Sequence, residues 1–115
     1  MAAHHIAPCR LRRSLLLALP ALAGPVHAES PLPQAMRRAE ALRDEALRVG
    51  DQGYGAVVLR GETVVGFAPS RVVTANDPTA HAEMEGIRDA ARRIGQRDLS
   101  GCLLVSTSRP CRMCE

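Results

Sequence analysis

The sequence of 115 residues contains no lysine and no tryptophan, and it has only one tyrosine and one phenylalanine. Its fifteen basic residues are therefore all arginines. Because aromatic side chains normally supply much of the buried apolar area, a core built from this chain has to rely on aliphatic residues. The length bounds the chain to one small domain.

A dense cluster of basic residues is also missing. From Glu29 onward, twelve arginines stand against twelve acidic residues, so this part is formally neutral and the overall charge of +3 belongs to residues 1–28. Binding to a nucleic-acid backbone needs clustered Lys or Arg. The nearest candidate, residues 88–97, interleaves its arginines with Asp89, as a solvated helix face does. The sequence therefore argues against a nucleic-acid partner and favours a small-molecule one.

No apolar run is long enough for a stable membrane span, which needs about 20 residues. The run from Ser14 to Gly24 follows the basic segment Arg10 to Arg13 and precedes Val26-His27-Ala28, a small-x-Ala cleavage site. This pattern predicts a signal peptide over residues 1–28, cleaved after Ala28, and an exported, periplasmic protein. Arg12-Arg13 before the apolar run is similar to a twin-arginine export signal. The alternative is a mis-assigned start codon ahead of a cytoplasmic protein.

The hydrophobic pattern after residue 28 predicts alternating helices and short strands. Apolar residues recur at three- and four-residue steps from Pro31 to Val49, which is typical of an amphipathic helix. Two short apolar runs on either side of Arg60-Gly61-Glu62 predict a hairpin. The expected elements are a helix over 31–49, strands over 55–59 and 63–67, a helix capped by Asp77 or Thr79 that runs to Ile94, a strand over 102–107, and a helix that begins at Pro110.

Four residues in two distant stretches have the chemistry of a metal centre. Cys111 and Cys114 are three apart, so one helical turn places both thiolates on the same face, where they can bind one ion together. His81, the only histidine after residue 28, supplies a third ligand for Zn²⁺. Three protein ligands with an open fourth position are typical of catalytic zinc. Glu83, two residues after the histidine, is the expected acid–base group.

The tripeptide His81-Ala82-Glu83 followed by Pro110-Cys111-Arg112-Met113-Cys114 resembles the signature of zinc nucleobase deaminases. From about Met36 to Glu115 the chain resembles the cytidine and deoxycytidylate deaminase superfamily, and residues 76–83 are most similar to its guanine deaminase and tRNA adenosine deaminase branch. The resemblance implies an α/β fold, a three-layer α/β/α sandwich, over residues 29–115. It also implies zinc-dependent hydrolytic deamination of a nucleobase or nucleoside with release of ammonia, a guanine-type purine being favoured.

The resemblance also indicates substrate contacts. In the related enzymes an asparagine in the loop corresponding to residues 68–76 contacts the substrate, and Ser70 occupies that position here. Ala82 and Pro110, next to the expected metal ligands, are further expected contacts. A homodimer is among the assemblies that the resemblance allows.

Two other interpretations stay open. The family fold continues with further helices and strands after the second cysteine, so the resemblance predicts a domain incomplete at its C-terminus, and a non-catalytic zinc-binding remnant is one alternative. An exported thiol–disulfide protein that uses Cys111 and Cys114 is the other, although it leaves His81-Ala82-Glu83 unexplained. Bound zinc without ammonia release would favour the remnant, and reversible dithiol oxidation without zinc would favour the redox protein.

Overall fold

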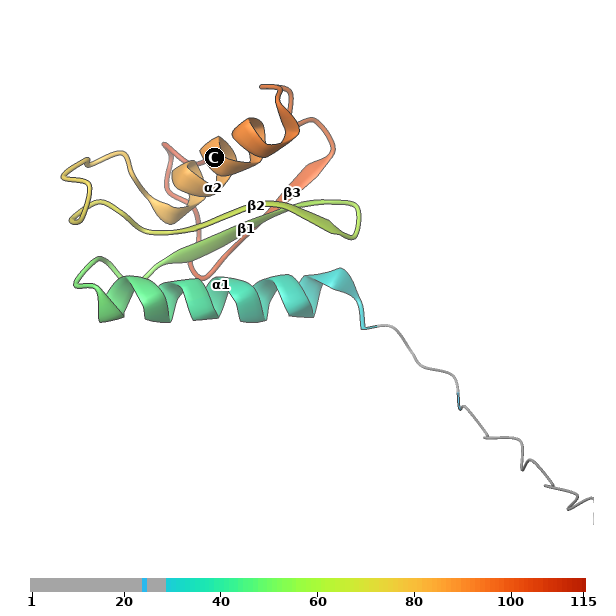
Figure 1. Ribbon diagram of the computed structural model, residues 1–115, viewed down its shortest axis with the longest axis horizontal. Helices are drawn as coiled ribbons and strands as arrows, with labels where there is room; N and C mark the ends of the chain where they lie inside the picture. The colour runs from blue at the N-terminus through green and yellow to red at the C-terminus, as the bar shows by residue number, and fades with distance from the viewer. Residues whose placement is uncertain (1–23, 25–28) are drawn as a thin grey trace, which may run out of the picture.

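The computed structural model describes Gly24 and residues 29–115, drawn in colour in Figure 1. In chain order its elements are α1 (Pro31–Arg48), β1 (Gly55–Arg60), β2 (Thr63–Pro69), α2 (Ala82–Ile94) and β3 (Cys102–Ser106). These elements confirm the predicted ones to within two residues at most ends. The signal peptide predicted over residues 1–28 lies outside the described residues, Gly24 apart. Within the described part of the chain, no helix combines the length and apolarity of a membrane span.

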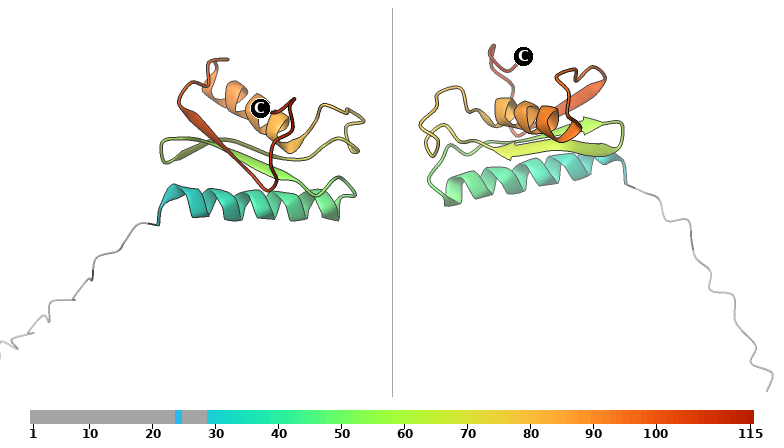
Figure 2. Two further views of the ribbon diagram at one scale, coloured as in Figure 1. Left: turned by 180° about the vertical axis from the view of Figure 1, so that it is seen from behind. Right: turned by 45° about the horizontal axis from the view of Figure 1, so that its top comes forward.

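The three strands form one antiparallel sheet in the order β2-β1-β3. The central strand β1 is buried over its first five residues. The two helices cover opposite faces of the sheet, so the molecule has an α/β/α arrangement of layers (Figure 1 and Figure 2). The predicted α/β fold is therefore confirmed for these residues.

The core lies mainly between α1 and the sheet. Small residues of α1, Ala35 and Ala39 among them, pack against Val57 and Leu59 of β1. Gly55 makes this close packing possible, because a Cβ atom at this position would lie 2.1 Å from the Ala39 carbonyl oxygen. The aromatic-poor sequence thus forms its core by close approach of backbones.

Gly66 plays the same part on the other face of the sheet. A Cβ atom there would lie 2.5 Å from the backbone nitrogen of Ala90 on α2. A helix that packs against a glycine can come closer to the strand than side chains normally allow. Both helices are therefore held near the sheet.

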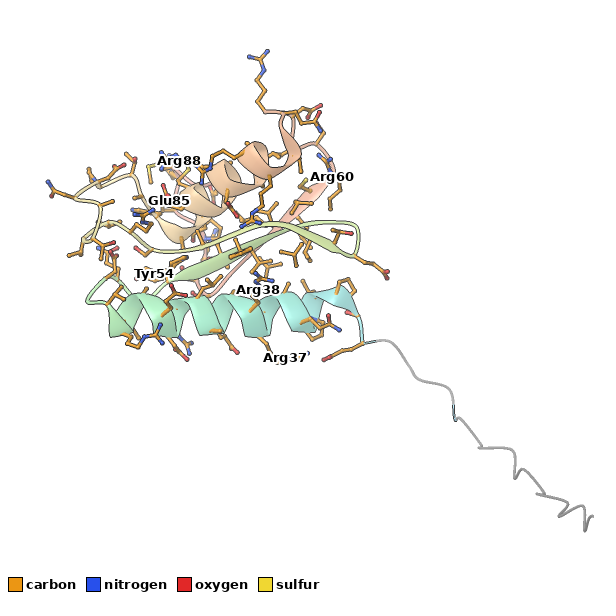
Figure 3. All side chains as sticks on the ribbon, in the orientation of Figure 1. Arg37, Arg38, Tyr54, Arg60, Glu85 and Arg88 are labelled. Atoms are coloured by element: carbon orange, nitrogen blue, oxygen red, sulfur yellow. The ribbon has the colours of Figure 1, made fainter. Side chains whose placement is uncertain are left out.

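Cation–π contacts connect both helices to the edge strand β2, and a hydrogen-bonded ion pair adds a second connection to α2. The guanidinium carbons of Arg38 from α1 and Arg93 from α2 lie 3.8 and 4.6 Å from the centre of the Phe67 ring. Figure 3 labels Arg38 between α1 and the sheet. The Phe67 N–H donates to the Asp89 carboxylate (3.1 Å), which also accepts from Arg93 (2.7 Å). Asp89, expected on a solvated face, therefore links α2 to β2.

The start of α2 differs from the prediction. His81 is the N-cap residue, and its side chain makes no capping hydrogen bond. Asp77 does not cap the helix; it accepts hydrogen bonds from the backbone and hydroxyl of Thr79, both at 2.8 Å, because a short Asp side chain readily bonds two residues ahead. The helix begins at Ala82, so the His81 ring stays available for other partners.

The helix predicted from Pro110 is not formed among the described residues; a turn takes its place. Residues 112–114 form a turn, in which the N–H groups of Cys114 and Glu115 both donate to the Cys111 carbonyl, at 2.9 and 3.1 Å. This single turn is still enough to place Cys111 and Cys114 on one side of the backbone, as the spacing predicted.

Candidate metal centre

Three side chains from two distant segments converge beside the start of α2. The two thiol sulfurs of Cys111 and Cys114 lie 3.7 Å apart, and each lies 3.7 Å from the Nδ1 atom of His81. These are the three residues that the sequence analysis predicted as ligands. Among the residues that the structure describes, they are the one group of His, Cys and acidic side chains close enough to hold an ion together.

The size of this triangle matches a zinc ion. Bond lengths of about 2.3 Å to sulfur and about 2.0–2.1 Å to nitrogen, in a tetrahedral arrangement, require about 3.8 Å between sulfurs and about 3.6 Å between sulfur and nitrogen. All three observed separations are 3.7 Å. The donor set of one imidazole and two thiols is also one that zinc prefers. The residues therefore fit Zn²⁺, and their number is that of catalytic sites.

The two thiols have different surroundings. Burial raises the pKa of Cys114, which is 7% exposed, to about 11. The exposed thiol of Cys111 has a lowered pKa because the N–H groups of Cys114 and Met113 stabilise its thiolate. A zinc site needs both groups as thiolates, so the cation has to compensate for the burial of Cys114, and binding releases protons.

Glu83 lies beside the ligands without being one of them. It stands in the first turn of α2 and is 4% exposed. Its Oε1 atom accepts a hydrogen bond from the hydroxyl of Ser106, the last residue of β3, at 2.9 Å. Free N–H groups at a helix start stabilise a carboxylate in this position. Glu83 is therefore a buried, oriented carboxylate, which suits proton transfer.

A cavity of about 330 Å³ opens over these residues, and its wall includes His81, Glu83 and Cys111. This volume is at the small end of the range for ligand pockets. Tyr54 and Gln52 also line it, although the sequence analysis assigned them no role. Figure 3 labels Tyr54 between the end of α1 and the start of β1. The signal that could have pointed to Tyr54 is the chain's only tyrosine, set between two glycines directly before a buried strand.

Ser70, the predicted substrate contact, is 1% exposed and points away from solvent. Its hydroxyl donates to the Asp51 carboxylate at 2.9 Å, and its N–H donates to the Tyr54 carbonyl at 2.9 Å. The structure therefore assigns the Ser70 side chain to a buried hydrogen-bond network behind the cavity wall. A direct contact with substrate stays a prediction.

Asp51 is the centre of that network. It is 6% exposed, and it accepts hydrogen bonds from the N–H groups of Val73 and Thr74 (3.1 and 2.7 Å), the Thr74 hydroxyl (2.8 Å) and the Gln52 N–H (2.8 Å). Burial by itself would raise the pKa of Asp51, but the hydrogen bonds from Thr74, Gln52 and Ser70 outweigh it and hold this pKa far below its usual range. Asp51 thus ties the loop after β2 to the segment that carries Gln52.

The other two predicted substrate contacts have different positions. Ala82 is completely buried at the start of α2. Pro110 is half-buried and lines a separate, mostly apolar groove of about 350 Å³, together with Leu32 and Met36 of α1. Their part in substrate binding also stays a prediction.

Residues 29–115 match the family model described as the cytidine and deoxycytidylate deaminase zinc-binding region. The chain therefore belongs to this family of zinc-binding deaminases. The predicted superfamily is confirmed, and zinc is the cofactor for which His81, Cys111 and Cys114 are placed.

The similar proteins belong to the predicted branch of the superfamily, the guanine deaminases and tRNA adenosine deaminases. The guanine deaminase of Bacillus subtilis (strain 168) is 38% identical over 80 residues, which cover 69% of this chain and 51% of the relative. A tRNA-specific adenosine deaminase of Aquifex aeolicus (strain VF5) is 39% identical over 77 residues, which cover 65% of this chain and 51% of the relative. The solved structure of the Bacillus subtilis guanine deaminase superposes with a TM-score of 0.67 at 35% identity, covering 71% of this chain and 53% of that one. The chain spans about half the length of the curated relatives it matches.

Proposed function

We propose that the protein is a zinc-dependent hydrolase that deaminates a nucleobase or nucleoside, with a guanine-type purine as the favoured substrate. The observation that carries this proposal is the 3.7 Å ligand triangle with a buried glutamate in the wall of the same cavity. The relatedness to a guanine deaminase supports the choice of a purine.

His81, Cys111 and Cys114 would hold the ion. Zinc in such a site supplies Lewis-acid chemistry, lowering the pKa of water to about 7 so that a nucleophile is available near neutral pH. The ligands leave Glu83 free, so its carboxylate can act as a base and an acid in turn.

Glu83 performs the proton transfers. Its carboxylate accepts a proton from the attacking water and passes it to the ring nitrogen next to the amino-bearing carbon. Oxygen adds to that carbon, the C–N bond breaks, and a second proton transfer releases the amine as ammonia while the ring gains a carbonyl. The hydrogen bond from Ser106 keeps one Glu83 oxygen in a fixed orientation throughout.

Tyr54 provides a surface for the planar ring. Its backbone is fixed by hydrogen bonds to Gln52 (2.8 Å) and from Ser70 (2.9 Å), while its side chain is 42% exposed and lines the cavity. Stacking of a base on an aromatic side chain contributes about 1–3 kcal/mol and tolerates different bases. Tyr54 therefore supports binding of a nucleobase without selecting one.

The decisive experiment compares Glu83→Gln with Glu85→Gln. Glu85 lies on the same helix, but its carboxylate pairs with Arg88 at 2.5 Å, and the two are labelled together in Figure 3. We expect about one zinc per chain in the wild type and both variants. Ammonia release from guanine, adenine and cytosine compounds should fall by about 10²–10⁴ in Glu83→Gln only, toward the upper end because Glu83 serves several steps.

Each other result has a definite meaning. Wild-type activity in Glu83→Gln contradicts the assigned proton shuttle. Zinc without ammonia release in the wild type favours the non-catalytic zinc-binding alternative. Reversible oxidation of Cys111 and Cys114 in a zinc-free protein favours the thiol–disulfide alternative.

Export and dimerisation also stay proposals. If residues 1–28 are a signal peptide, mass spectrometry of the protein expressed in a bacterial host should find Glu29 at the mature N-terminus. Intact protein that begins at Met1 and stays in the cytoplasm would contradict export. The molar mass in solution tests the homodimer.

A further inference from the structure

Arg109 is the feature of the cavity that the proposed chemistry leaves unused. It lines the same cavity as Glu83 and Tyr54, and its side chain is exposed. The ion pairs among residues 29–115 use five other arginines, so no carboxylate of the described chain neutralises Arg109. A cation at a cavity rim without an internal partner is available to a ligand.

The charged groups of the cavity wall differ in burial. Glu83 is 4% exposed, whereas Arg109 is exposed, so we take Glu83 as the inner end of the cavity and Arg109 as its mouth. With a zinc ion and two thiolates beside it, Glu83 leaves the inner end with a formal charge of −1. An anionic group would be repelled there and attracted at the mouth. A ligand with both a ring amino group and an anionic group is therefore oriented amino group first.

We propose that the cavity takes a purine nucleoside monophosphate, with the phosphate bound by Arg109 and the ring against Tyr54. This inference rests on the proposed function, which it deepens by naming the substrate class. A guanidinium donates two parallel hydrogen bonds to a phosphate, and this geometry makes arginine well suited to phosphate recognition. A small cavity of about 330 Å³ accommodates the ring while the phosphate stays at the exposed rim.

A free mononucleotide suits the chain better than RNA. A polyanionic backbone needs several basic residues along one path, and residues 29–115 have equal numbers of arginines and acidic residues. One unpaired guanidinium at the cavity matches one phosphate.

The test measures binding rather than turnover. Guanine, guanosine, guanosine 5′-monophosphate and a short single-stranded RNA are titrated into the zinc-loaded Glu83→Gln parent and into the same parent carrying Arg109→Gln, Arg109→Lys or Arg112→Gln. In this background no ligand is consumed, and the contribution of Arg109 is measured without the charge of Glu83. Arg112 is the matched control, because it is equally charged, exposed and close in sequence, yet does not line the cavity.

We expect the monophosphate to bind the Glu83→Gln parent about tenfold more tightly than guanosine, since one charge-assisted contact contributes roughly that factor when partly exposed to solvent. Arg109→Gln should remove this preference, Arg112→Gln should keep it, and Arg109→Lys should retain part of it. The preference should also decrease with added salt.

Equal affinity for guanosine and its monophosphate would overturn the inference, as would an equal loss in Arg112→Gln. RNA binding stronger than that of the mononucleotide, and lost in Arg109→Gln, would assign the residue to a nucleic-acid substrate instead. The proposed function fails separately, when zinc-loaded protein with an intact Glu83 releases no ammonia from any of these compounds, a result that leaves the affinities above unchanged.

Discussion

The two halves of the metal centre are held in place in different ways. His81 and Glu83 stand at the start of α2, a helix packed on the sheet, and Glu83 is hydrogen-bonded to β3. Cys111 and Cys114 lie after β3 on a single turn, which has two backbone hydrogen bonds to one carbonyl. The fold thus arranges the first half in advance, whereas the backbone around the two cysteines is held by this single turn. A bound metal therefore contributes most to the order of residues 108–115.

The largest expected effect comes from removing the cysteine half. In the double variant Cys111→Ser/Cys114→Ser, zinc should fall from about one ion per chain to near zero, because the remaining imidazole alone does not retain it. Elemental analysis measures this, with Cys102→Ser on β3 as the control that keeps its zinc. Equal zinc in the wild type and the double variant would contradict the assignment of the ligands.

Removing the metal should increase the difference in order between residues 108–115 and α2. Hydrogen exchange measured before and after chelation should show at least about tenfold faster exchange for amides of residues 108–115, while the amides of α2 change little. If the α2 amides lose as much protection, the fold does not arrange His81 and Glu83 in advance and the comparison fails.

The Asp51 network anchors the loop that leads into α2 to the segment before β1, so Asp51→Ala should destabilise the fold. Three backbone N–H groups and two hydroxyl groups would lose their charged acceptor, and we expect the free energy of unfolding at pH 7 to fall by about 2–4 kcal/mol. Urea denaturation measures this. Asp77→Ala is the control, since Asp77 accepts only from Thr79 and should cost less.

The loss of stability in Asp51→Ala should depend on pH. The pKa of Asp51 is lowered in the folded state, so its contribution is complete above the pKa of an unfolded aspartate, about 3.9, and is lost as the pH falls toward the folded pKa. The difference between the wild type and Asp51→Ala should therefore shrink as the pH is lowered below about 4. A constant difference between pH 7 and pH 3 would contradict the depressed pKa.

The smallest expected effect concerns the hydrogen bond between Ser106 of β3 and Glu83 of α2. Ser106→Ala removes the donor to Glu83, and the turnover rate should drop by about fivefold to tenfold, equal to roughly 1 kcal/mol, with unchanged zinc content. Ser100→Ala, remote from the cavity, is the control. An unchanged rate in Ser106→Ala would show that helix packing alone orients Glu83.

The sequence contained enough information for the ligands and for most element boundaries. Cys111 and Cys114 could be predicted because i and i+3 share a face even in one turn. The strands β1 and β2 could be placed because short apolar runs flank a glycine turn. The start of α2 was misplaced because Asp77 bonds to Thr79 instead of capping the helix, a local competition that residue types alone do not decide.

The wall of the cavity could not be predicted in the same way. Asp51 and Ser70 are nineteen residues apart, and their contact exists only because the sheet brings the two loops together. Tyr54 and Arg109 meet the metal ligands through that same tertiary arrangement. Unlike the metal ligands, these wall residues belong to no motif or spacing from which their long-range contacts could be predicted.

The contacts around Phe67 affect whether a further strand can pair with the edge strand β2. The Phe67 N–H, which a further strand on β2 would need as a donor, already donates to the Asp89 carboxylate, and Arg38 and Arg93 lie against the Phe67 ring. The opposite edge is β3, where Leu103 is 52% exposed. Pairing of a further strand on β2 is therefore opposed by a contact between side chain and backbone that already occupies its edge.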